Sequence, residues 1–198
     1  MIPRVVAAEA EKVGTRYKYA GNVIQGMKPA ESMFGYTYFA HMVPPFKPGH
    51  TLMLGYGVGT VADLMRRVWG GQVKITGVDC EAQNYDYVEH RMKVMDAKEF
   101  IWDCTKDSFF RGKIPLFPKE RFDYVCVDLW DGGVVPDFVF EVEFVVRLRE
   151  IETKLMCMNV GDGDVKRTRA YYDYGFRFDR VVPIEGNRVM WWSVVGDR

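Results

Sequence analysis

Short apolar runs alternate with longer mixed stretches through the middle of the chain. The runs expected as strands are 51–54, 73–78, 92–95, 122–127 and 154–160, and most of them end at a glycine or an aspartate. The stretches expected as helices are 61–68, which has apolar residues at helical spacing, 98–102, 138–151 and 164–174. Strands that alternate with helices predict an α/β fold with a mainly parallel sheet between helices.

The N-terminal part of the chain has a different pattern. Residues 15–19 and 23–25 read as two strands around the turn Ala20-Gly21-Asn22, which predicts a short hairpin. The apolar and aromatic stretch 33–42 is expected as a helix, and Pro44, Pro45 and Pro48 then separate it from the main domain.

The C-terminal part predicts a second hairpin. Residues 177–183 and 188–195 flank Glu185-Gly186-Asn187, which is typical of an antiparallel turn. With 198 residues, the chain is expected to form one main domain over 46–198, preceded by a hairpin and helix extension over 1–45.

Composition narrows the classes of function. The 27 basic residues balance the 27 acidic ones, so no net charge attracts nucleic acid or an anionic membrane. No run approaches the roughly 20 apolar residues that span a bilayer. The 4 cysteines form no CxxC pair and the 3 histidines no metal-binding cluster, so no metal is expected and the chain reads as cytoplasmic.

The glycine-rich turn after the first main strand is the first candidate site. Gly55 allows a tight exit from the strand, and Gly57 allows the backbone to approach a ligand closely. A dinucleotide fingerprint would need a further glycine at Thr60, whereas the third glycine here is Gly59. This GxGxG spacing is typical of S-adenosylmethionine sites, and the alternative is a glycine turn without a ligand.

Acids follow the next two strands. Asp79 is placed to accept both hydroxyls of a ribose, and Asp96, followed by Ala97, to accept a hydrogen bond from an adenine amino group. For each acid the alternative is a helix N-cap.

A third acidic segment, Asp128-Leu129-Trp130-Asp131, follows the strand at 122–127. Two acids three positions apart at the carboxyl edge of a sheet are able to bind an amine, or one of them to remove its proton as a general base. Trp130 would wall an apolar pocket or cover the sheet edge. The alternative for the acids is loop capping with solvation.

With these motifs the sequence resembles the spermidine synthase-like branch of the class I S-adenosylmethionine-dependent methyltransferases, whose fold is Rossmann-like. The resemblance runs from about Gly21 to Val195. It rests on the segments LMLGYGVGT, ITGVD, MDAKEF and FDYVCVDLWD, on Val23-Ile24-Gln25 with Tyr36 and Pro44-Pro45 upstream, and on the closing Glu185-Gly186-Asn187-Arg188-Val189.

The resemblance implies roles for single residues. Gly55, Gly57, Gly59, Asp79 and Asp96 with Ala97 would hold the nucleoside, and Gln25 would lie near the cofactor. Asp128 would be the amine-activating base and Asp131 would bind the substrate amine. Tyr36, Tyr38 and Trp130 would wall the acceptor site.

Two positions depart from the aminopropyltransferases of this branch. Val58 stands where they usually carry an aspartate that favours a decarboxylated cofactor, and Tyr38 stands where they carry a polyamine-binding glutamate. Each change removes a negative group from a site meant for a polycation, so polyamine synthesis carries over poorly.

The expected function is therefore an S-adenosylmethionine-dependent transferase, of methyltransferase type, that acts on a small-molecule acceptor. The first alternative is a polyamine aminopropyltransferase that uses decarboxylated S-adenosylmethionine. The second is a non-catalytic nucleoside-binding domain. Neither nucleic acid nor membrane is expected as a partner, and the N-terminal hairpin and helix are the candidate surface for a homodimer.

Overall fold

In the computed structural model the described residues are 11–13, 16–19, 22–24, 38–57, 59–80, 91–105, 121–131, 133–151, 153–184 and 186–194. Two residues of the predicted site, Gln25 and Tyr36, lie outside these ranges, as does Val58 of the glycine turn.

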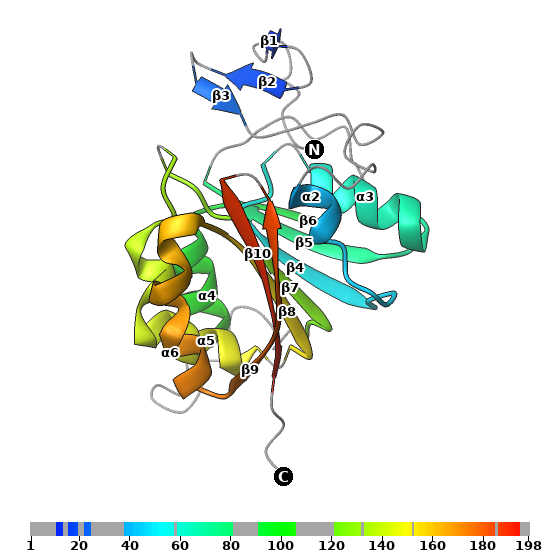
Figure 1. Ribbon diagram of the computed structural model, residues 1–198. Coiled ribbons are helices and arrows are strands. Elements are labelled where there is room, and N and C mark those ends of the chain that lie inside the picture. Colours follow the sequence, from blue (N-terminus) through cyan, green and yellow to red (C-terminus); the bar gives the residue numbers. More distant parts are fainter. Residues whose placement is uncertain are drawn as a thin grey trace.

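A seven-stranded sheet forms the centre of the domain (Figure 1). Its strands are β4 (His50–Leu54), β5 (Lys74–Asp79), β6 (Arg91–Val94), β7 (Tyr124–Val127), β8 (Leu155–Gly161), β9 (Phe176–Ile184) and β10 (Asn187–Val194). They lie in the order β6-β5-β4-β7-β8-β10-β9. The first five are parallel, whereas β10 is antiparallel to both β8 and β9. The prediction of a mainly parallel sheet with a C-terminal antiparallel hairpin is confirmed.

The strand order reverses next to β4. From β4 the chain proceeds to β5 and β6 on one side, and then returns to β7 and β8 on the other. In open α/β sheets, ligands bind outside the carboxyl ends of the strands at such a switch point. The glycine turn that follows β4 lies at this point.

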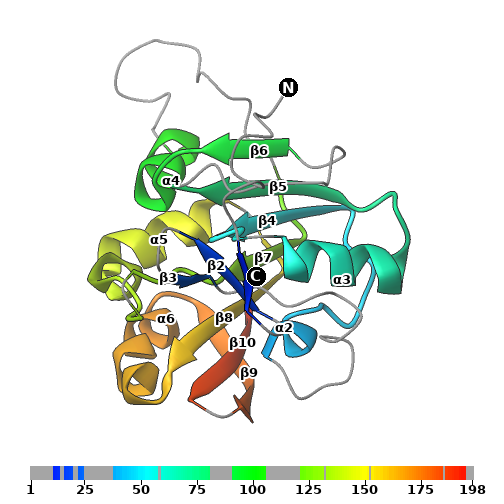
Figure 2. The ribbon, with the colours of Figure 1, turned by 90° about the horizontal axis from the view of Figure 1, so that it is seen from above.

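Helices cover both faces of the sheet. On one face lie α4 (Ala97–Thr105), α5 (Val142–Glu150) and α6 (Arg169–Asp173), and on the other lie α2 (Tyr38–His41) and α3 (Thr60–Trp69). Figure 2 shows the same division from above, with α3 and α2 on the side away from α4, α5 and α6.

The alternation of side chains along the strands divides the core into two clusters. Leu52 and Leu54 of β4 pack with α4, α5 and α6, while Met53 between them packs with α2 and α3. In β8, Met156 and Met158 belong to the first cluster and Cys157 to the second. Successive side chains of a strand point to opposite faces, and helices cover both faces here, so nearly every residue of β4 and β8 is buried.

Two predicted helices differ from the structure. The stretch 138–151 is divided into a 3-10 helix (Asp137–Phe140) and α5, because Glu141 between them has an extended backbone with ψ 139°. The stretch 164–174 begins as a 3-10 helix (Asp162–Thr168) and becomes α-helical only in α6. Aromatic and β-branched side chains at 138–140 lower α-helix propensity there, which favours the shorter 3-10 form.

The N-terminal hairpin is confirmed and gains one strand. The strands β2 (Arg16–Tyr19) and β3 (Asn22–Ile24) pair antiparallel, and β1 (Glu11–Val13) pairs with β2. They form a sheet separate from the main one. Of the helix predicted at 33–42, the described part is α2, followed by a turn at Met42.

Candidate functional site

The first glycine of the turn brings two strand ends together. Gly55 has a positive φ of 80°, and its N–H and that of Tyr56 donate to the carbonyl of Val78 at 2.9 and 3.2 Å. A Cβ atom on Gly55 would overlap the carbonyl oxygen of Asp128. Glycine is therefore required at this position so that the end of β4 can lie against the chain leaving β7.

The next two glycines form the rest of the turn. Gly57 and Gly59 also have positive φ values, 54° and 79°, which glycine adopts without strain. Gly59 is the N-cap of α3, and as a glycine it provides no side-chain cap for this helix. The first N–H groups of a helix lack intrahelical partners, so they and the partial positive charge of this end favour a polar or anionic ligand group.

Asp79 joins the end of β5 to the glycine turn. Its Oδ2 accepts a hydrogen bond from the N–H of Gly57 at 2.7 Å, and the residue is only 9% exposed. The carboxylate thus ties the turn to the end of β5, where hydroxyl groups of a ligand on the turn could donate to it. Residues 81–90 lie outside the described part of the chain, so the N-cap alternative for Asp79 stays untested.

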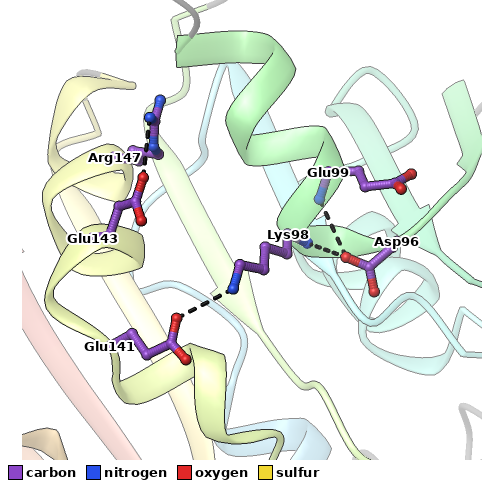
Figure 3. A network of polar contacts seen from close by, with 6 residues as sticks. All are labelled: Asp96, Lys98, Glu99, Glu141, Glu143 and Arg147. Atoms are coloured by element: carbon purple, nitrogen blue, oxygen red, sulfur yellow. Dashed lines mark hydrogen bonds and ion pairs between the residues drawn. The ribbon is translucent and has the colours of Figure 1, made fainter.

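Asp96 is a helix N-cap, the role that the sequence offered as the alternative to adenine binding. Its Oδ1 accepts hydrogen bonds from the backbone N–H of Lys98 at 2.7 Å and of Glu99 at 3.2 Å, so it caps the start of α4 (Figure 3). Ala97, the first residue of α4, is 4% exposed and packs in the core. The adenine contact remains a prediction for this segment.

Polar contacts link α4 to α5 and to the residue before it. Lys98 Nζ lies 3.2 Å from Glu141, which precedes α5, and Arg147 pairs with Glu143 at 3.3 Å within α5 (Figure 3). Arg147 also donates to Thr105 of α4 at 3.0 Å. The contacts of Lys98 with Glu141 and of Arg147 with Thr105 thus join the two ends of α4 to α5 and the residue before it.

Asp128 is the centre of the polar contacts at the end of β7. Its Oδ1 accepts from the indole Nε1 of Trp130 at 3.0 Å and from the amide Nδ2 of Asn159 at 2.9 Å. The hydroxyl of Tyr38 in α2 also hydrogen-bonds this carboxylate. Residues from α2, β8 and the loop after β7 therefore converge on one acid.

Burial raises the pKa of Asp128 from 3.8 to about 6. Desolvation is the largest cause and outweighs the three hydrogen bonds, which lower the pKa, while the charge of Asp79 raises it further. A carboxylate with a pKa near 6 is mostly ionised at neutral pH and is still a stronger base than an ordinary aspartate. These are the properties that a general base requires.

The other members of the acidic segment lie differently. Asp131 is exposed, and its backbone closes a tight turn with Val134 through hydrogen bonds of 2.8 and 3.1 Å. Trp130 is half-buried, and a Cβ placed on Gly161 would lie 3.9 Å from its ring. The tryptophan thus covers the carboxyl ends of β7 and β8, while its indole holds Asp128.

Sequence reasoning missed Asn159. This residue is 1% exposed and donates to Asp128 from the neighbouring strand. The only signal for it was a single amide side chain inside the otherwise apolar run 155–160. The contact of Tyr38 with Asp128 was also missed, and its expected role as a wall of the acceptor site stays a prediction.

In the described part of the chain, no group of three or more histidine, cysteine, aspartate or glutamate side chains is arranged to hold a metal ion. Within the same ranges, no helix is long and apolar enough to cross a membrane.

Comparison with known proteins gives the fold. No protein-family model matches the sequence, and no curated protein matches it significantly. Solved structures do match. Spermidine synthase from Thermotoga maritima has a TM-score of 0.61 and 12% identity, over 94% of this chain and 72% of that one. A probable spermidine synthase from Corynebacterium glutamicum has a TM-score of 0.60 and 14% identity, over 93% and 75%.

A third match is to a protein with a bound cofactor. Fibrillarin from Aeropyrum pernix, solved with natively bound S-adenosyl-L-methionine, has a TM-score of 0.52 and 16% identity, over 96% of this chain and 86% of that one. The chain therefore has the Rossmann-like fold that class I S-adenosylmethionine-dependent methyltransferases and spermidine synthases share.

Proposed function

We propose that this protein is an S-adenosylmethionine-dependent transferase that moves a methyl group to a small-molecule acceptor. The observation that carries the proposal is the position of Asp128, a half-buried carboxylate held by Trp130 and Asn159, whose partial desolvation raises its pKa to about 6. It lies beside the glycine turn at the switch point of a fold whose solved members include cofactor-bound methyltransferases.

The cofactor would be held by the residues around the turn. Gly55, Gly57 and Gly59 add no side chains to the turn against which a ligand would lie, and the start of α3 would offer N–H donors to its carboxylate. Asp79 would accept the ribose hydroxyls. Gln25, Asp96 and Ala97 complete the proposed set near the adenine and the rest of the cofactor.

Methyl transfer needs alignment and one proton acceptor. The bond between the methyl carbon and the sulfonium sulfur breaks, a bond to the acceptor heteroatom forms, and S-adenosylhomocysteine leaves. Asp128 would take the proton that the acceptor loses, either as the bond forms or after it. Tyr38 and Trp130 would line the acceptor side and limit water, and Asp131 would contact the acceptor from the rim.

Methyl transfer is preferred to aminopropyl transfer on two grounds. Val58 and Tyr38 replace two acidic groups that a polycationic substrate and a decarboxylated cofactor would need. Each charge-assisted contact of this kind contributes about 1.5–3 kcal/mol, so their loss would weaken polyamine binding strongly.

The leaving nucleoside identifies the reaction class, whichever acceptor is methylated. The protein would be incubated with S-adenosylmethionine or with its decarboxylated form, together with a panel of amines, phenols and carboxylic acids. We expect S-adenosylhomocysteine from the first cofactor, and its absence with Asp128→Asn while cofactor affinity changes only a few-fold. Methylthioadenosine formed from the decarboxylated cofactor and a polyamine would instead support aminopropyl transfer. Full activity of Asp128→Asn would remove this residue from the mechanism.

A further inference from the structure

Asn159 is a buried polar residue in an otherwise apolar part of the core. In β8 the side chains of Leu155 and Cys157 pack with the cluster beneath α2 and α3. Because side chains alternate along a strand, Asn159 continues this face at the carboxyl end of β8. It is 1% exposed, and its strand neighbours Met158 and Val160 are fully buried.

Among the described residues, one half of the Asn159 amide has a hydrogen-bond partner and the other half has none. Its Nδ2 donates to Oδ1 of Asp128 at 2.9 Å, whereas its own Oδ1 is buried with no hydrogen-bond partner among the described residues. An unsatisfied buried acceptor lowers stability, so such a group is uncommon in native cores. The contact with Asp128 is thus the feature that distinguishes this amide from an apolar side chain of similar size.

We propose that Asn159 is a positioning residue. Its Nδ2 donates to Oδ1 of Asp128, which holds that carboxylate in place and favours the ionised form of Asp128 for the proposed transfer. This inference rests on the proposed function, because a base is needed only if a proton is moved. An amide N–H that donates to a carboxylate stabilises the charged form and lowers its pKa, against the desolvation that raises it.

Other groups also act on Asp128. The indole of Trp130 and the hydroxyl of Tyr38 donate to it, and the charge of Asp79 across the site raises its pKa. The thiols of Cys126 and Cys157 lie on the same side of the sheet, and burial raises the pKa of both, so they remain neutral at neutral pH. Asn159 is the partner that comes from the strand next to β7, and the main chain of β8 fixes its position.

Carbon-13 NMR of aspartate-labelled protein tests the proposal directly. The Asp128 carboxyl signal, assigned by its loss in Asp128→Asn, should titrate with a midpoint near 6. In Asn159→Leu, which keeps the number and branching of the side-chain heavy atoms and removes the donor, we expect the midpoint to rise to roughly 7, the scale of one charge-assisted hydrogen bond. At pH 7 the ionised fraction would then fall from about nine-tenths to about half.

Thr51→Val is the matched control. Thr51 is fully buried in β4 and its hydroxyl also lacks a hydrogen-bond partner in the described structure, so the change removes a buried polar group without touching Asp128. The Asp128 midpoint should not move in this variant. A folded Asn159→Leu protein with an unchanged or lower midpoint would overturn the proposal.

A second measurement covers the case in which Asn159→Leu does not fold. In the wild-type protein the side-chain amide protons of Asn159 should change their chemical shift with the same midpoint as the Asp128 carboxyl. Independent titration of the two groups would overturn the proposal. Neither NMR titration requires a methyl acceptor. Absence of any transfer activity would therefore refute the proposed function, while the titrations would still show whether Asn159 positions Asp128.

Discussion

Replacing Asp128 with asparagine should stabilise the protein at neutral pH although it removes the proposed base. The carboxylate is desolvated, so its ionisation opposes folding. Asparagine has nearly the same shape, carries no charge, and still offers an oxygen to the donors from Trp130 and Asn159.

The size of the effect follows from the raised pKa of Asp128. The folded state binds the proton more tightly than the unfolded chain, whose carboxyl has a pKa of 3.8, against about 6 in the fold. The stability that the protonated group contributes is therefore complete below about pH 4 and is lost as the pH rises through about 6. At about 1.4 kcal/mol for each pKa unit, the loss approaches 3 kcal/mol at pH 7 as an upper bound.

Urea unfolding of both proteins between about pH 4 and pH 8 measures this difference. The free energy of unfolding of Asp128→Asn relative to wild type should increase across this range. Asp123→Asn is a control of opposite sign, because the hydrogen bond from Lys154 lowers the pKa of Asp123. That variant should be less stable than wild type at neutral pH, and the deficit should shrink only in stronger acid. A pH-independent difference between wild type and Asp128→Asn would refute the reasoning.

Three further changes test other parts of the account. Gly55→Ala should cost more than about 3 kcal/mol of stability, because the new Cβ would meet the Asp128 carbonyl. Gly70→Ala, at a φ of 87° but with open space around it, should cost about 1 kcal/mol. Thermal unfolding compares the two variants, and equal losses would contradict the close approach of Gly55 to Asp128. Asp96→Ala should lose about 1 kcal/mol by removing the cap of α4, and unchanged S-adenosylmethionine affinity in it would argue against adenine binding. Val58→Asp should shift cofactor preference toward decarboxylated S-adenosylmethionine by about 1–3 kcal/mol in competition binding, and a wild type that already prefers this form would favour aminopropyl transfer.

The strand ends were predictable from the sequence because short apolar runs between glycine and aspartate carry a strong local signal. Gly55 and Asp79 were placed at the carboxyl edge on this basis, and the structure brings them to one turn. Residues that follow parallel strands lie at the same carboxyl edge of the sheet, so no contact between side chains had to be known.

Contacts between separate elements were less accessible from the sequence. Asn159 could not be linked to Asp128 before the neighbouring strands β7 and β8 were in register, because 31 positions separate them in the chain. Asp96 is an acid that both a cap and a ligand site would use, and only the observed bond to Lys98 identifies the cap. The break at Glu141 was only partly accessible: the aromatic and β-branched side chains at 138–140 weaken the α-helix locally, but they do not fix the residue at which the backbone becomes extended.

Calorimetric titration with S-adenosylmethionine and S-adenosylhomocysteine tests the central claim, that the turn from Gly55 to Gly59 is a cofactor site. We expect both ligands to bind wild-type protein at one site. In Asp79→Ala the ribose would lose its acceptor and Gly57 its partner, so binding should weaken by about 1–3 kcal/mol, which is roughly 5- to 150-fold. An unchanged dissociation constant in that variant would limit Asp79 to holding the turn. Absence of binding by both ligands at millimolar concentration would contradict the cofactor assignment itself.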